Sequence, residues 1–212
     1  MLTGRGAESP VISFRLDSVE GLELRGSKAE VAAYCKRRAV QLFAVPRQED
    51  SDDTMLAILK TSSFKDGVIE AEIAGSPRPG APSDARGFVG IAFRVQSDAS
   101  HYECFYLRPT NGRADDQLRR NHSTQYVSAP DYPWDRLRKE NPGVYESYVD
   151  LESGKWSRVK IVVSGTQARL YVNGADQPTL VVNDLKLGET RGQVALWADR
   201  TTDAHFSNLT IK

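Results

Sequence analysis

The stretch SRVKIVVSGTQARLYVNG, residues 157–174, decides the fold. Apolar and polar side chains alternate on both sides of a short Ser-Gly-Thr link, which is typical of strands with one buried face. The link is short enough for a hairpin, and Asn173-Gly174 is a strong turn signal after the second strand. The sequence therefore predicts two strands whose buried residues are Val159, Ile161 and Val163 in the first and Ala168, Leu170 and Val172 in the second.

The same period recurs along much of the chain. RGFVGIAFRVQS (86–97) places Val89, Ile91, Phe93 and Val95 on one face, and HYECFYLRP, GQVALWAD and AHFSNLTIK add further short strands. Residues 29–45, AEVAAYCKRRAVQLFAV, are compatible with a helix, but two strands around Lys36-Arg37-Arg38 agree better with their neighbours. Many short strands without a long amphipathic helix predict an all-β, two-sheet antiparallel sandwich, with residues 1–212 as a single domain.

Composition excludes several classes of protein. Apolar residues make up 40% of the chain and charged residues 26%, so the chain is not disordered by composition. Lys plus Arg equals Asp plus Glu at 28 each, which gives no general argument for nucleic acid. No apolar run reaches the roughly 20 residues that span a bilayer, and the start, MLTGRGAESP, shows no secretory signal. A secreted or periplasmic location is favoured only if a signal was removed.

Several segments together resemble concanavalin A-like jelly rolls, the lectin and glucanase architecture. FKDGVIEAEI, GFVGIAFRV, HYECFYLRP, GQVALWAD and AHFSNLTI carry the resemblance with the 157–174 stretch, in this order. Within this architecture, the sequence most resembles laminin-G-like domains and the 3-keto-disaccharide hydrolase-type family. Residues 60–212 match well and the first 60 loosely. The resemblance implies a curved sandwich whose concave sheet carries a glycan-type groove, but the fold hosts lectins, glycosidases and adhesion modules alike.

Carboxylate motifs of the enzymes on this fold are incomplete in this chain. The keto-disaccharide hydrolase pattern reads roughly Tyr-Glu-x-Gln; Tyr102 and Glu103 match it, but Phe105 replaces the Gln. The laminarinase motif Glu-x-Asp-x-(x)-Glu is absent. Glu70 and Glu72 share a strand face and are interpreted as a solvated outer face rather than as a catalytic pair.

Two adjacent strands offer candidate binding residues. Arg94 is expected opposite the apolar face of its strand, outside the core, and Tyr102, Tyr106 and Arg108 share one face of the next strand. Tyrosine stacks on sugar rings, and arginine presents a fixed fork to hydroxyls and carboxylates. The alternative is that the tyrosines pack beneath a loop and the arginines are solvated or ion-paired.

A long interval, residues 109–150, follows these strands. Its aromatic residues and prolines argue against disorder and predict an ordered loop insertion. STQYVS is a candidate strand and WDRLRKE a candidate helical turn. A rigid loop carrying His122, Tyr126 and Trp134 fits one wall of a carbohydrate site, although the same aromatics would also attach the loop to the sandwich.

Three functions follow for these residues. The first is a carbohydrate-binding module that uses Arg94, Tyr106, Arg108, His122, Tyr126 and Trp134 to bind an oligo- or polysaccharide. The second is a glycan-active enzyme, such as a glycoside hydrolase, with Glu103, His122 or Asp131 as acid/base candidates, His122 first because histidine titrates near neutrality. The third is a structural or adhesion domain.

Cofactors and disulfides have little support in the sequence. No cofactor or metal site is predicted, although a structural calcium ion is compatible with the fold. The acidic stretch QEDSDDT (48–54) is interpreted as a solvated turn. Cys35 and Cys104 are either two buried free thiols, which we favour, or one disulfide in an oxidising compartment.

Overall fold

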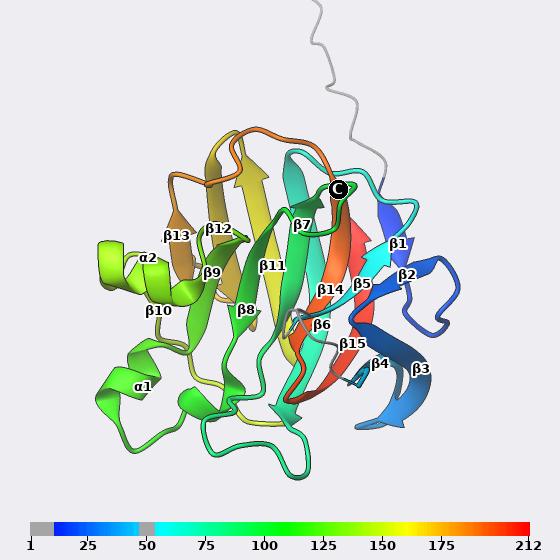
Figure 1. Cartoon of the computed structure of the whole chain (residues 1–212), viewed down its shortest axis with the longest axis horizontal. Helices are drawn as coiled ribbons and strands as arrows, with labels where there is room; N and C mark the ends of the chain where they lie inside the picture. The colour runs from blue at the N-terminus through cyan, green and yellow to red at the C-terminus, as the bar shows by residue number, and fades with distance from the viewer. Residues whose placement is uncertain (1–10, 47–53) are drawn as a thin grey trace, which may run out of the picture.

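The computed structural model describes residues 11–46 and 54–212, and within them antiparallel strands form two sheets packed face to face (Figure 1). Sheet A runs, in spatial order, through β13 (Leu180–Val182), β12 (Gln167–Val172), β11 (Ser157–Ser164), β6 (Gly67–Pro77), β15 (Thr202–Ile211), β4 (Arg37–Ala44) and β3 (Ser27–Tyr34), with β1 (Ile12–Phe14) also paired to β15. Sheet B runs through β10 (Glu146–Ser147), β9 (Thr124–Ala129), β8 (Tyr102–Leu107), β7 (Val89–Val95), β14 (Gln193–Asp199), β5 (Thr54–Leu59) and β2 (Leu22–Arg25). The predicted two-sheet antiparallel sandwich is confirmed. Most of the acidic stretch 48–54 lies outside the described residues.

Both predicted hairpins are present in sheet A. In the first, β11 pairs with β12 so that Ile161 lies opposite Leu170, and both side chains are buried. In the second, β3 pairs with β4 across Cys35 and Lys36, whose φ angles of 45° and 66° are typical of a tight turn. The helical alternative for residues 29–45 is therefore wrong.

The core fills the space between the sheets. Ile69 and Ile73 of β6 in sheet A and Phe93 and Phe105 of sheet B are each at most 2% exposed. Full burial of such a side chain stabilises the fold by roughly 1.5–3 kcal/mol. The sandwich is held by this shared apolar layer.

The outer face of sheet A carries the two acids considered above. Glu70 forms an ion pair with Lys212 at 2.9 Å, and Glu72 forms one with Arg37. Both carboxylates point away from the core residues that alternate with them. They belong to a charged outer face, as the alternation predicts.

The interval 109–150 is ordered and adds to sheet B. It contains the 3₁₀ helix η1 (Pro109–Asn111), α1 (Gln117–Asn121), β9, α2 (Trp134–Glu140) and β10. The predicted strand in STQYVS and the predicted helical turn in WDRLRKE are both confirmed. Figure 1 shows α1 and α2 beside the β9–β10 edge of sheet B, across the molecule from β3. The interval thus builds one end of the sheet as well as a loop over it.

Both cysteines are free. Cys104 is buried, but Cys35 is exposed at the β3–β4 turn. The expectation of free thiols holds, and the expectation that both are buried is wrong for Cys35.

Candidate functional site

A row of side chains crosses the outer face of sheet B, the face turned away from sheet A. The strand register places Trp197 opposite Gly90, Gly90 opposite Tyr106, Tyr106 opposite Gln125, and Gln125 opposite Glu146. The rings of Tyr106 and Trp197 stack with centroids 4.7 Å apart. Gly90 permits this stack, since a Cβ there would lie 2.6 Å from the Cβ of Tyr106. The row is aromatic at one end and polar at the other.

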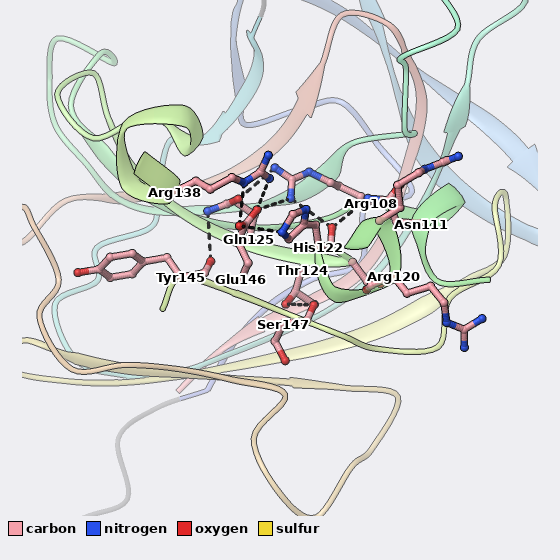
Figure 2. A network of polar contacts seen from close by, with 12 residues as sticks. Arg108, Asn111, Arg120, His122, Thr124, Gln125, Arg138, Tyr145, Glu146 and Ser147 are labelled. Atoms are coloured by element: carbon pink, nitrogen blue, oxygen red, sulfur yellow. Dashed lines mark hydrogen bonds and ion pairs between the residues drawn. The ribbon is translucent and has the colours of Figure 1, made fainter. Parts of the chain in front are cut away.

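Arg108 joins the two halves of the row (Figure 2). It is 5% exposed. Its Nη2 donates to the Tyr106 hydroxyl at 3.1 Å and to Gln125 Oε1 at 3.0 Å, and its Nη1 donates to Glu146 Oε1 at 3.0 Å. Gln125 Nε2 in turn donates to the backbone carbonyl of Tyr126 at 2.7 Å, which fixes the orientation of the amide. Arg108 is therefore held rigidly beneath the site.

Glu146 receives two further groups from the 109–150 interval. Arg138 of α2 binds it with both nitrogens of a fork, Nε lying 2.9 Å from Oε2. His122, the residue that ends α1, places Nε2 3.4 Å from Glu146 Oε2. One buried carboxylate thus gathers two arginines and a histidine, and Figure 2 shows the three side chains converging on it.

The protonation states follow from these neighbours. Burial alone would raise the pKa of Glu146, but the hydrogen bonds from Arg138 and the charges of Arg108 and Arg138 lower it. Burial lowers the pKa of His122, and the attraction of Glu146 only partly offsets this. Burial raises the pKa of Tyr106 to about 12. At neutral pH the site therefore holds an ionised Glu146, a neutral His122 and a protonated Tyr106.

Three neighbouring hollows open over this face. The arginine hollow, of about 500 Å³, is lined in part by Arg86, Arg108, Arg119, His122 and Arg138. The aromatic hollow, of about 270 Å³, is lined in part by Tyr102, Tyr106, Val127 and Trp197. Phe88, Trp134 and Asp199 line both of these hollows. The outer hollow, of about 680 Å³, shares His122 and Arg138 with the arginine hollow.

Trp134 forms the wall between the arginine and aromatic hollows. It begins α2 and is 46% exposed, which is unusual for so large an apolar side chain. The guanidinium carbon of Arg138 lies 4.7 Å from the centroid of its ring, and that of Arg108 lies 5.9 Å away. The arginines stabilise one side of the indole ring by cation–π attraction. Much of its surface remains available to a ligand.

Arg94 does not lie on the outer face of sheet B, and its predicted place there is wrong. It is fully buried, and its guanidinium donates to the carbonyls of Lys65 at 2.8 Å, Gly165 at 2.7 Å and Gly188. The reason is a β-bulge: β7 has one residue more than β14 near this point, and Arg94 has a φ of 53°. The bulge breaks the alternation from which its position was predicted.

Tyr126 and Glu103 were candidates as well, and the structure places both inside the sandwich. Each is fully buried, and the Tyr126 hydroxyl donates to Glu103 Oε2 at 2.6 Å. The backbone N–H of Leu187 donates to Glu103 Oε1 at 2.7 Å. Burial raises the pKa of Glu103, and the hydrogen bond from Tyr126 counteracts this. Neither side chain lines any of the three hollows, so the structure does not bring them together with the other predicted site residues.

Asp131 lies outside the site. It is exposed, and its backbone carbonyl accepts a hydrogen bond from Arg136 of α2. It lines none of the three hollows, so the structure gives no support to an acid/base role.

The remaining predicted residues come together. Tyr106, Arg108, His122 and Trp134 all line the connected arginine and aromatic hollows. Sequence reasoning missed the residues that complete the site: Arg86, Arg119, Gln125, Arg138 and Glu146. The polar–apolar alternation carried no signal for Gln125 or Glu146, because their role depends on which strands pair. A density of arginines in LRRNH and DRLRKE was the one clue to Arg119 and Arg138.

Residues 11–46 and 54–212 contain neither a metal-ligating cluster nor a helix that could span a membrane. No group of three or more His, Cys, Asp or Glu side chains is arranged there to hold a metal ion. None of the helices in the same residues has the length and apolar character needed to cross a membrane.

Comparison with known proteins identifies the fold. No family model and no curated protein matches the chain in sequence. Among solved structures it is similar to the carbohydrate-binding module CBM66 from Bacillus subtilis, at 16% identity and a TM-score of 0.56, covering 89% of this chain and 97% of that one. A Bacillus subtilis protein of unknown function with a galectin-like fold has 12% identity and a TM-score of 0.62, covering 94% of each chain. Peanut lectin has 10% identity and a TM-score of 0.57, covering 97% and 98%.

These likenesses define a class of fold. The protein is a concanavalin A-like jelly-roll sandwich, as the sequence resemblance implied. At these identities the likeness concerns the fold alone.

Proposed function

We propose that the protein binds carbohydrate on the outer face of sheet B, across the arginine and aromatic hollows. The observation that carries this proposal is the half-exposed Trp134 ring standing between a floor of stacked aromatics and a set of fixed hydrogen-bond donors. Sugar rings combine an apolar C–H face with a rim of hydroxyls, so they suit a surface that offers both. The lectin and the carbohydrate-binding module among the similar folds support the same interpretation.

The connected hollows also favour an oligosaccharide over a single sugar. The aromatic and arginine hollows share Phe88, Trp134 and Asp199, and the arginine and outer hollows share His122 and Arg138. We propose that together they act as one groove over the outer face of sheet B that accommodates several sugar rings. The hydroxyls of Tyr106 and Tyr102 and the fork of Arg138 lie along it.

Calorimetric titration with a panel of neutral and acidic oligosaccharides tests the proposal. We expect binding that Trp134→Ala weakens about fivefold or more, because stacking on an exposed aromatic contributes about 1 kcal/mol. Tyr171→Ala is the matched control, since Tyr171 lies on β12 in sheet A, outside all three hollows. Unchanged affinity in Trp134→Ala would contradict the placement of the site. If no oligosaccharide of the panel binds and a protein partner is recovered instead, the result would favour an adhesion domain.

A second candidate function is glycan cleavage at the same site. The observation in its favour is the contact between His122 and Glu146, in which a neutral imidazole is oriented by a buried carboxylate. Such an imidazole can accept a proton from a substrate or an attacking water. Glu146 itself is a poor proton donor, because Arg108 and Arg138 hold it ionised.

Prolonged incubation with the bound oligosaccharide distinguishes the two functions. If the protein is an enzyme, new chain ends appear, and His122→Ala abolishes them while leaving affinity within a few-fold. His101→Ala is the control, because His101 pairs with Asp98 in the β7–β8 turn outside the three hollows. A ligand recovered intact would leave binding as the function.

A further inference from the structure

The arginine hollow concentrates positive charge, although the chain as a whole carries no net charge. Lys plus Arg equals Asp plus Glu at 28 each, so the cluster does not reflect a generally basic protein. Four arginines line the hollow, against two lining aspartates and Glu146 behind them. Local excess charge of this kind attracts an oppositely charged ligand, since the walls of a hollow reduce screening by water.

The four arginines differ in their partners. Arg108 and Arg138 both form ion pairs with Glu146, as shown in Figure 2. In the described part of the chain, neither Arg86 nor Arg119 has a carboxylate oxygen within ion-pair distance. Two of the cations that line the hollow therefore lack an anionic partner.

Arg86 is held by its own loop. Its Nη1 donates to the carbonyls of Ser83 at 2.8 Å and Ala85 at 3.0 Å, and no other bond of its guanidinium is formed among the described residues. Burial and the positive charges of Arg119 and Arg108 lower the pKa of Arg86, and the negative charge of Asp84 offsets this only in part, as expected for guanidinium groups that line one hollow. An anion between them would compensate these positive charges.

Arg119 is positioned by α1. Asp116 caps the helix by accepting the backbone N–H of Arg119 at 2.9 Å, and Arg119 Nη2 lies 3.5 Å from Asn111 Oδ1. Its Nε is buried without a hydrogen-bond partner. A buried donor that lacks a hydrogen-bond partner is unfavourable. A ligand oxygen that accepts hydrogen bonds from the Arg119 guanidinium would supply such a partner.

The acidic residues of the hollow offset this charge only in part, because three carboxylates face four arginines. Asp84 is exposed at the rim and forms no ion pair with Arg86 or Arg119. Asp199 accepts hydrogen bonds from the backbone and hydroxyl of Thr201. Both oxygens of Glu146 are already engaged by Arg108, Arg138 and His122.

The position of Trp134 relates the charge to the sugar. Trp134 lines the arginine hollow together with Arg86 and Arg119, so a ring stacked on the indole presents its substituents to these guanidiniums. Arginine matches planar carboxylates and the oxygens of sulfate with two parallel hydrogen bonds. Hydroxyl groups alone would leave the positive charge uncompensated.

We infer that the ligand is an anionic glycan, whose carboxylate or sulfate groups are bound by Arg86 and Arg119 while a sugar ring stacks on Trp134. This inference rests on the proposed function, and it adds the chemical class of the sugar.

Calorimetric titration of matched ligand pairs tests it. Oligogalacturonides and their carboxyl-reduced counterparts form one pair, and sulfated and desulfated chondroitin oligosaccharides form the other, so that the carboxylate and the sulfate are distinguished. We expect one acidic member to bind at least about tenfold more tightly than its neutral partner, as charge-assisted hydrogen bonds predict. Its affinity should fall as salt is raised, because ions screen the attraction.

The arginines are tested by the double variant Arg86→Gln/Arg119→Gln. We expect it to lose the preference for the acidic ligand, and Arg119→Lys to retain a part of it, since lysine keeps the charge without the fork. Arg169→Gln removes the same kind of charge from β12 on sheet A, outside the hollows, and should bind like the wild type. Thermal unfolding of each variant confirms that it is folded.

The outcomes separate the inference from the proposed function. Equal binding of acidic and neutral partners, still dependent on Trp134, would overturn the anionic ligand and leave carbohydrate binding intact. Retention of the acidic preference in Arg86→Gln/Arg119→Gln would overturn the role of these two arginines. Failure of every oligosaccharide to bind the folded wild type would overturn both.

Discussion

Arg94 and Arg108 are two buried arginines, on neighbouring strands, with opposite roles. Arg94 gives its hydrogen bonds mainly to backbone carbonyls at Lys65, Gly165 and Gly188, with a longer ion pair to Asp66 at 3.3 Å, and so ties three loops together inside the protein. Arg108 gives its bonds mainly to side chains, Tyr106, Gln125 and Glu146, which form the outer face of sheet B.

The difference teaches that burial of a charged residue does not by itself identify a functional site. What matters is which groups satisfy the guanidinium. Backbone acceptors stabilise loops, whereas side-chain acceptors next to a hollow create an ordered polar surface. Arg94 thus contributes to the stability of the fold, whereas Arg108 contributes both to the site and to stability.

The largest expected effect is on stability, in Arg94→Met. This change leaves three half-buried carbonyl groups without the donor that Arg94 supplies, each a loss of about 1 kcal/mol, so we expect the free energy of unfolding to fall by about 3 kcal/mol. Urea unfolding measures it, with Arg169→Met as an outer-face control expected to stay within about 0.5 kcal/mol. A loss below about 1 kcal/mol would show that Arg94 is not the tie between these loops.

Arg108→Met should have a smaller effect on stability and a larger one on binding. Glu146 keeps Arg138, so we expect the free energy of unfolding to fall by only about 1–3 kcal/mol. The affinity for the oligosaccharide should fall about tenfold or more, because Tyr106 and Gln125 lose the group that orders them. Urea unfolding and calorimetry on the same preparation measure both. The contrast between the two arginines fails if Arg108→Met binds normally.

The smallest expected effect is a pH dependence from His122. Its folded pKa is lower than the ordinary 6.5, so the unfolded chain binds the proton first. The stability that this group contributes is therefore present above pH 6.5 and is lost as the pH falls through the folded pKa. We expect His122→Gln to lose less stability than the wild type between pH 7.5 and 5.5.

His205 provides the internal control for that measurement. Burial lowers its pKa too, but it is present in both proteins, so its contribution cancels from the difference. Identical pH profiles for the wild type and His122→Gln would show that His122 is not desolvated by the site.

The fold was predictable because its signal is local. Alternation in residues 157–174 correctly assigned the buried residues of β11 and β12, and the strand and helical turn predicted within residues 109–150 are present as β9 and α2. The same rule placed Tyr106 and Arg108 on one face of β8, and the structure shows them in contact on the outer face of sheet B.

The site was predictable only in part, since alternation does not say which face is outside. Tyr126 carries the aromatic hydroxyl of a binding residue, yet its register with Phe105 turns it into the core. Arg94 follows the parity of an outer residue, but a bulge redirects it. Each error arose where pairing with a neighbouring strand overrode the local pattern.

The sequence by itself determined that this chain forms short antiparallel strands in two sheets, each with one apolar face. The reason is that the alternation of apolar and polar side chains is set by the geometry of each strand alone. It also determined that the 109–150 interval is ordered, through its aromatic content. Only the tertiary structure decided that Glu146 meets Arg108, Arg138 and His122, since these residues come from a strand, the residue after another strand, a helix and a helix end. It also decided that Arg86 and Arg119 line the same hollow, where neither forms an ion pair with a carboxylate of residues 11–46 or 54–212. Contacts between distant segments depend on how the strands pair and pack, which no local pattern records.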